Sequence, residues 1–179
     1  MKSRLFSTLA LILLLLNSSC EKDDICPEAT PTTPQLVIRF YDIVDNDETK
    51  SVSGLFAYGL DESNNAIPIE GLNISTTDSI TIPLRTDQTS TRFVLHSDFD
   101  IEENDPDDPN DDVILGNPDA ITVNYTPEDV YVSRACGFKT VFRNLVLTVD
   151  NDAENWIINT GIVINDVEQQ TQAHVQVFH

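Results

Sequence analysis

The chain has 179 residues and a mass of 20.0 kDa, a size that suits one domain of ordinary length. Its 30 acidic and 10 basic residues give a net charge of -20, which excludes nucleic acid as a partner because nucleic-acid binding depends on lysine and arginine at the phosphates. Forty per cent of the residues are apolar and 22% are charged, so the chain can form a core and is not disordered throughout.

The first twenty residues have the three-part plan of an export signal. Two basic residues precede a twelve-residue, largely apolar run, Leu5–Leu16, and three small or polar residues then lead to Cys20. The run is shorter than the roughly 20 apolar residues of a membrane-spanning helix, so we expect its removal on export. The segment resembles a bacterial lipoprotein signal, which implies that Cys20 becomes the lipid-bearing first residue of the mature protein. Asn17 departs from the aliphatic residue expected there, and an ordinary secretory signal cut near Ser19 is the alternative.

The residues after Cys20 resemble a signal that sends lipoproteins of the Bacteroidota type to the cell surface. The motif is a lysine two places after the cysteine, among acids: Glu21, Lys22, Asp23 and Asp24. The alternative is a solvated leader that keeps the anchor away from the domain. Removal of residues 1–19 takes away Lys2 and Arg4, so the mature chain carries -22.

Cys26 and Cys136 are the two cysteines that remain once Cys20 is lipidated. In an exported protein two such thiols usually pair, and we predict a Cys26–Cys136 disulfide that closes a loop of 111 residues. Neither cysteine has the spacing of a zinc ligand. A free catalytic thiol at Cys136 is the alternative, although no base lies near it in sequence.

The next segment, up to Pro34, is rich in proline and threonine, a composition that favours extended chain. We therefore expect three parts: a signal peptide at 1–19, a lipidated N-terminus with its tether at 20–34, and a folded domain at 35–179. With the predicted disulfide, only residues 21–25 separate the lipid from a bond into the domain, which would hold it within roughly 20 Å of the anchor.

From Gln35 onward the dominant pattern is an alternation of apolar and polar residues with period two, and polar turns separate the stretches. We predict strands near residues 35–42, 52–60, 79–84, 90–97, 120–126, 129–134, 138–149, 156–166 and 171–179. Nine short strands indicate an all-β fold, either an antiparallel β-sandwich or a flattened barrel. We favour the sandwich, which could be immunoglobulin-like in architecture. Trp156 follows Cys136 instead of lying between two bridged cysteines, so we interpret it as a core or sheet-edge residue.

The chain contains no nucleophile elbow, phosphate-binding loop, dinucleotide fingerprint or zinc-protease motif. His96, His174 and His179 are far apart in sequence, and the alternation around His174 predicts an outward-facing side chain. We therefore expect a protein that is not an enzyme and needs no cofactor. A polysaccharide hydrolase that uses dispersed carboxylates is the alternative, because acids are so numerous here that a pair has no diagnostic value.

The stretch Asp98–Asp112 carries nine acids and no base. We interpret it as a solvated acidic loop between two strands, kept irregular by its prolines. The alternative is weak calcium binding, which hard oxygen ligands at alternating positions favour. Its ligands would be Asp105, Asp107, Asp108, Asn110 and Asp112, in a calcium-dependent adhesion element.

Four segments together look like an uncharacterised family of Bacteroidota-type lipoproteins: Cys20–Pro27, Leu36–Asp42, Tyr131–Phe138 and His174–Phe178. The resemblance implies an exported, lipid-anchored protein and brings no activity or catalytic residue with it. We therefore expect a non-enzymatic protein at the outer membrane, exposed on the cell surface. It would touch the membrane through its lipid and bind or scaffold an envelope protein or a glycan.

Overall fold

The structure is a computed structural model, and it describes residues 25–28, 30, 32–104 and 112–179. The described residues fall into two compact units. The larger one, called the body, contains residues 32–104, 112–130 and 139–179. The smaller one, called the hairpin-tip unit, contains residues 25–28, 30 and 131–138.

All regular structure in the described residues is β-strand, so the predicted all-β class is confirmed. The strands are β1 (Leu36–Tyr41), β2 (Val52–Leu60), β3 (Ala66–Pro68), β4 (Ser75–Thr77), β5 (Ser79–Ile82), β6 (Ser90–Glu102), β7 (Val113–Ser133), β8 (Gly137–Val149), β9 (Asn159–Ile162) and β10 (Val175–Phe178). The described part of the chain holds no helix that could cross a membrane.

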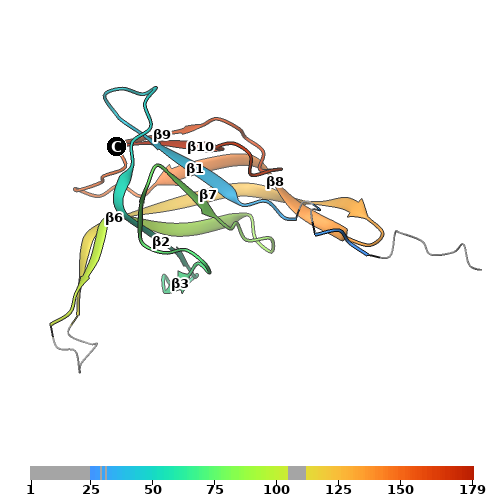
Figure 1. The fold of residues 1–179 in the computed structure, drawn as a ribbon, viewed down its shortest axis with the longest axis horizontal. Coiled ribbons are helices and arrows are strands. Elements are labelled where there is room, and N and C mark those ends of the chain that lie inside the picture. Colours follow the sequence, from blue (N-terminus) through green and yellow to red (C-terminus); the bar gives the residue numbers. More distant parts are fainter. Residues whose placement is uncertain (1–24, 29, 31, 105–111) are drawn as a thin grey trace, which may run out of the picture. The chain divides into compact units, whose positions relative to one another are not determined.

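The strands form two sheets (Figure 1). The first has the order β5-β1-β10-β9, and the second has the order β3-β2-β6-β7-β8, with β4 also paired to β2. The pairs with a described register are antiparallel except β1 with β10, where Ile38 lies opposite Val175 in a parallel ladder. The two sheets are consistent with a sandwich, as expected, and the immunoglobulin-like variant stays a prediction.

The core lies between the sheets and contains the faces that the alternation predicts. Leu36, Ile38 and Phe40 of β1 are fully buried, as are Leu95 of β6 and Val123 of β7. Buried side chains from both sheets form one cluster, to which β10 of the first sheet and β8 of the second also contribute. Apolar alternation thus places one face of each sheet against the other.

Two predicted strands, 120–126 and 129–134, are parts of the single long strand β7. The sequence suggests a break there because Pro127 interrupts the pattern. A proline lacks the N–H that a ladder needs, but it is tolerated where one edge of the strand is free. β6 begins at Ser90, opposite Asn124, so β7 has already run past its β6 neighbour when it reaches Pro127.

Candidate functional site

A two-stranded ribbon extends from the second sheet where β6 ends and β7 begins. In the body, β6 pairs with β7 as far as Ser97 opposite Asn117, and pairing resumes at Asp100 opposite Leu115. Figure 1 shows this ribbon, in yellow-green, flanked by no other labelled strand. We call residues 98–102 and 113–116 the arm. The sequence interpretation of residues 98–102 as loop is wrong, since they belong to β6.

A β-bulge in β6, between Ser97 and Asp100, forms the base of the arm. Both neighbouring strands have a glycine against it, Gly54 in β2 and Gly116 in β7. Asp98 has a φ of 51° and Gly116 has a φ of 101°. A Cβ atom on Gly116 would lie 2.6 Å from the carbonyl oxygen of Ser97, and one on Gly54 would lie 2.9 Å from the backbone nitrogen of Phe99. The extra residue of a bulge changes which face the following side chains occupy. Phe99 therefore shares a face with His96 instead of with Leu95.

Four rings meet beside this bulge, on the face of the second sheet that points away from the core. Phe99 lies 4.5 Å from Phe56 and 5.1 Å from His96, between ring centroids. Tyr58 lies 5.7 Å from His96 and 6.2 Å from Phe56. We call these four residues the aromatic root of the arm. Phe56, Tyr58 and Phe99 are half-buried, so part of each ring contacts solvent.

His96 is the most buried member of the root, with 5% of its surface exposed. Its Nδ1 atom has no hydrogen-bond partner. Burial lowers the pKa of His96 and raises the pKa of Tyr58, because a buried group loses the hydration that stabilises its charged form. Both side chains are therefore neutral near pH 7, and the root is an apolar surface.

The arm continues this apolar surface with aliphatic side chains. Cross-strand partners share a face, so Ile101 and Ile114 lie together and alternate with Leu115 and Val113 on the opposite face. The exposed fractions are 50% for Ile101, 65% for Ile114, 45% for Val113 and 39% for Leu115. The pleat places Phe99 on the same face as Ile101. Exposed apolar side chains therefore lie on both faces of the ribbon, and on one face Leu115 and Val113 stand beside their cross-strand partners Asp100 and Glu102.

Acidic side chains surround the aliphatic ones. Asp98, Asp100, Glu102 and Glu103 are exposed, and the sequence holds no basic residue between positions 98 and 112. The arm thus combines exposed apolar side chains with a strong negative charge.

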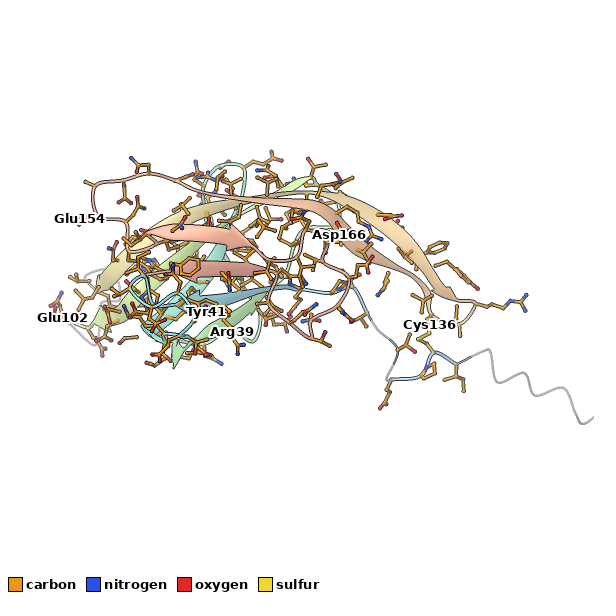
Figure 2. All side chains as sticks on the ribbon, turned by 90° about the horizontal axis from the view of Figure 1, so that it is seen from above. Arg39, Tyr41, Glu102, Cys136, Glu154 and Asp166 are labelled. Carbon is orange, nitrogen blue, oxygen red and sulfur yellow. A yellow bond between two sulfur atoms is a disulfide. The ribbon has the colours of Figure 1, made fainter. Side chains whose placement is uncertain are left out.

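The second candidate region is the hairpin-tip unit. Cys26 and Cys136 form a disulfide with their Cα atoms 4.9 Å apart, which confirms the predicted pairing and makes the free-thiol alternative wrong. Figure 2 labels Cys136. The backbone N–H of Cys136 donates to the hydroxyl of Ser133 within the turn between β7 and β8. Cys20, Glu21, Lys22, Asp23 and Asp24 lie outside the described residues.

Residues 52–179 match a family of unknown function (DUF6452). The chain belongs to this family. Comparison with curated proteins and with solved structures finds no significant match. The match confirms the expectation of an uncharacterised family, while the lipoprotein and Bacteroidota parts of that expectation stay predictions.

The DUF6452 match begins at the first residue of β2 and runs to the end of the chain. It contains the aromatic root and the described strands of the arm. Of the two disulfide cysteines it contains Cys136 alone, because Cys26 precedes the matched range.

The three histidines of this DUF6452 member have separate structural surroundings. His174 is 1% exposed, so the expectation of an outward-facing side chain is wrong. Its Nδ1 accepts a hydrogen bond from the backbone N–H of Val37 at 3.0 Å, which fastens the start of β10 to β1. His179 packs against Trp156 at 5.6 Å. Trp156 packs against the core, as interpreted from its sequence position, and its Nε1 donates to the carbonyl of Leu95.

Asp119 is a buried acid that the sequence interpretation missed. It has no exposed surface; one carboxylate oxygen accepts the backbone N–H of Ile157 at 2.8 Å and the other has no partner. Burial raises the pKa of Asp119. The signal was present in the alternation, because Asp119 stands two residues before Ile121 and four before Val123, on the core face of β7.

Most of the calcium ligands expected from the sequence lie outside the described residues. Asp105, Asp107, Asp108 and Asn110 lie outside them, and Asp112 is the single described member of that set. The described residues contain no group of three or more acids, histidines or cysteines that could hold a metal ion. The weak calcium site stays a prediction.

An open hollow of about 650 Å³ borders the disulfide, with Arg134 as its charged lining residue. A smaller hollow of about 120 Å³ includes Asp61 and Glu62. Asp61 accepts hydrogen bonds from the backbone N–H groups of Ser63 and Asn65, so it stabilises a turn. Among the described residues, no carboxylate lines the larger hollow, and the hydrolase alternative stays a prediction.

Proposed function

We propose that this DUF6452 member is a non-enzymatic, lipid-anchored binding module of the outer membrane that holds another envelope protein through its arm. The observation that carries the proposal is the exposure of large aliphatic residues on both faces of the arm, next to the aromatic root. A two-stranded ribbon alone is marginally stable in water, and exposed apolar patches commonly mark interaction sites. A partner that covers both faces would bury these side chains.

The chemistry of the arm favours a protein with a basic surface. Aliphatic side chains such as Ile101 and Ile114 offer no hydrogen bonds to the hydroxyl groups of a glycan, whereas they suit the apolar centre of a protein interface. The exposed carboxylates of Asp98, Asp100 and Glu102 would meet lysine and arginine at its rim. A second copy of the chain is disfavoured because two strongly acidic molecules repel each other.

Membrane attachment through Cys20 is the other half of the proposal. It is supported by the signal-like segment before Cys20 and by the disulfide, which fits an oxidising compartment. Two or three acyl chains would give durable anchoring. Residues Glu21–Asp24 would direct the protein to the cell surface.

Metabolic labelling with an alkyne fatty acid tests the anchor. The wild-type chain should take the label and stay in the membrane fraction, and the Cys20→Ser variant should do neither. Protease added to intact cells should remove the wild-type protein if it is displayed outside. An unlabelled wild-type chain in the soluble fraction would contradict the anchoring proposal.

Site-specific photo-crosslinking tests the binding surface. A benzoylphenylalanine at position 114, in the arm, should capture one envelope protein on intact cells, and the same residue at position 163 should not. Val163 is a suitable control because it is 55% exposed and lies outside the arm.

The captured protein is then purified and its affinity measured. Ile101→Ser with Ile114→Ser should weaken binding strongly, whereas Ile158→Ser with Val163→Ser, at other exposed apolar positions, should not. Binding should also weaken as salt is added, because charge pairs at the rim are screened. An adduct that contains only glycan or a second copy of this chain, or an affinity that both double variants leave unchanged, would contradict the proposal.

A further inference from the structure

Three large apolar side chains of the hairpin-tip unit are exposed. The exposed fractions are 79% for Ile25, 60% for Tyr131 and 67% for Phe138. Tyr131 and Phe138 flank the turn between β7 and β8, and their rings meet edge to face at 5.5 Å. Ile25 is the neighbour in sequence of Cys26, which the disulfide joins to the same turn. These three residues are called the tip patch.

The hairpin-tip unit is electrically neutral within a strongly acidic chain. Its described residues include one acid, Glu28, and one base, Arg134, while the whole chain carries -20. A surface without net charge can approach an anionic lipid layer without the repulsion that the other parts of the chain would meet.

The disulfide also limits how far this patch can lie from the lipid anchor. Cys26 lies six positions after Cys20 in sequence, and an extended chain spans about 3.3 Å per residue. Cys26 can therefore lie at most about 20 Å from Cys20. The bond to Cys136, whose Cα atom lies 4.9 Å from that of Cys26, keeps the turn between β7 and β8 nearly as close.

We propose that Ile25, Tyr131 and Phe138 lie in the interfacial region of the lipid bilayer that holds the acyl chains of Cys20. This inference rests on the anchoring proposed above. Aromatic side chains concentrate at the membrane interface, where tyrosine places its ring among apolar groups and its hydroxyl in water. The acyl chains retain the protein, and the tip patch adds a second contact that fixes how the hairpin-tip unit meets the membrane.

Tryptophan quenching by brominated lipid measures this contact. Tyr131→Trp, Phe138→Trp and the control Val163→Trp are each introduced into the full-length protein, and the lipidated products are reconstituted into vesicles of phosphatidylcholine with brominated acyl chains. These lipids have no net charge, so the acids at positions 21–24 are not repelled. The wild-type chain, with Trp156 as its single tryptophan, supplies the baseline. Thermal melting shows whether each variant folds like the wild type.

We expect the tryptophans at 131 and 138 to be quenched severalfold more strongly than the one at 163. Equal quenching at all three positions, or none at 131 and 138, in protein that carries lipid and floats with the vesicles would overturn the inference and leave the anchor intact. Protein without a lipid mass on Cys20 that stays free of vesicles would overturn the anchor and the inference together. Mass spectrometry of the N-terminal peptide separates these outcomes.

Discussion

The rings of His96 and Phe99 meet at a right angle with their centroids 5.1 Å apart, although the two residues are three positions apart in one strand. Regular alternation would place them on opposite faces of the sheet. The bulge between Ser97 and Asp100 brings them together and so connects the arm to the aromatic root. The candidate binding surface therefore depends on a backbone irregularity as well as on its side chains.

Gly116→Ala should destabilise the protein by about 2–4 kcal/mol, because the new Cβ would collide with the carbonyl oxygens of Ser97 and Asp98 at 2.6 and 2.8 Å. The backbone there has a φ of 101°, which adds strain for any residue with a side chain. Urea unfolding gives the free energy. Gly71→Ala is the matched control, since Gly71 also has a positive φ, 76°, but has no atom within 4 Å of the added Cβ. Equal losses of unfolding free energy in the two variants would contradict the close contact between Gly116 and the backbone of Ser97.

His96→Phe should raise the free energy of unfolding at neutral pH or leave it unchanged. The phenyl ring keeps the aromatic contacts and removes a buried nitrogen, Nδ1, that has no partner. Thermal and urea unfolding measure the effect. A large loss of stability would mean that Nδ1 has a partner in solution, such as a bound water.

The contribution of the buried histidines to stability should decrease as the pH falls below about 6.5. Burial lowers the pKa values of His96, His174 and His179 below their ordinary value of 6.5. Each histidine therefore contributes stability that is fully present above 6.5 and is lost as the pH falls through 6.5 toward the folded-state pKa. The loss is at most about 1.4 kcal/mol per pH unit for each histidine. Urea unfolding of the wild type and of His96→Phe between pH 8 and pH 5.5 measures the His96 contribution, and the stability difference should shift in favour of His96→Phe as the pH falls.

The disulfide should protect both of its cysteines and contribute stability. In a Cys20→Ser background, iodoacetamide should label neither Cys26 nor Cys136 before reduction and should label both after reduction and unfolding. The bond joins residues 110 positions apart, and the chain-entropy model gives a contribution of about 4–5 kcal/mol for such a loop. Cys26→Ser with Cys136→Ser should lower the free energy of unfolding accordingly. Labelling of both thiols in the native, unreduced protein would rule the bond out.

Features that depend on local alternation or on cysteine number could be predicted from the sequence. The buried face of Leu36, Ile38 and Phe40 follows from period two, and the Cys26–Cys136 bond follows from two thiols in an exported chain. The parallel pairing of β1 with β10 joins the two ends of the domain, and no local pattern indicates it.

The arm and its root were hidden for physical reasons. The acids between Asp98 and Asp112 indicate a solvated loop, and they mask the strand character of Ile101, whose cross-strand partner Ile114 lies beyond that range. Phe99 has the same parity as Leu95, so period two alone would place it in the core. The bulge in β6 reverses that alternation. It lies against Gly116 of β7, a contact that depends on the pairing of the two strands and not on the local sequence.

Asp119 provides a final prediction, because its hydrogen bond with Ile157 stabilises the fold while burial of its charge opposes it. Asp119→Ala removes the acceptor for the buried N–H of Ile157 and should cost about 1–3 kcal/mol. Asp119→Asn keeps an acceptor oxygen and removes the charge. Burial raises the folded-state pKa of Asp119 above its ordinary value of 3.8, so the stability contributed by the neutral acid is present below 3.8 and is lost as the pH rises through the folded-state pKa.

At pH 7 the expected order of stability is therefore Asp119→Asn at or above the wild type, and Asp119→Ala below both. The difference between Asp119→Asn and the wild type should shrink as the pH is lowered toward 3.8, and contributions from other groups cancel in this difference. Urea unfolding of the three proteins at several pH values measures it. A wild type that is clearly more stable than Asp119→Asn at pH 7 would mean that the second carboxylate oxygen of Asp119 binds a cation or another donor in solution.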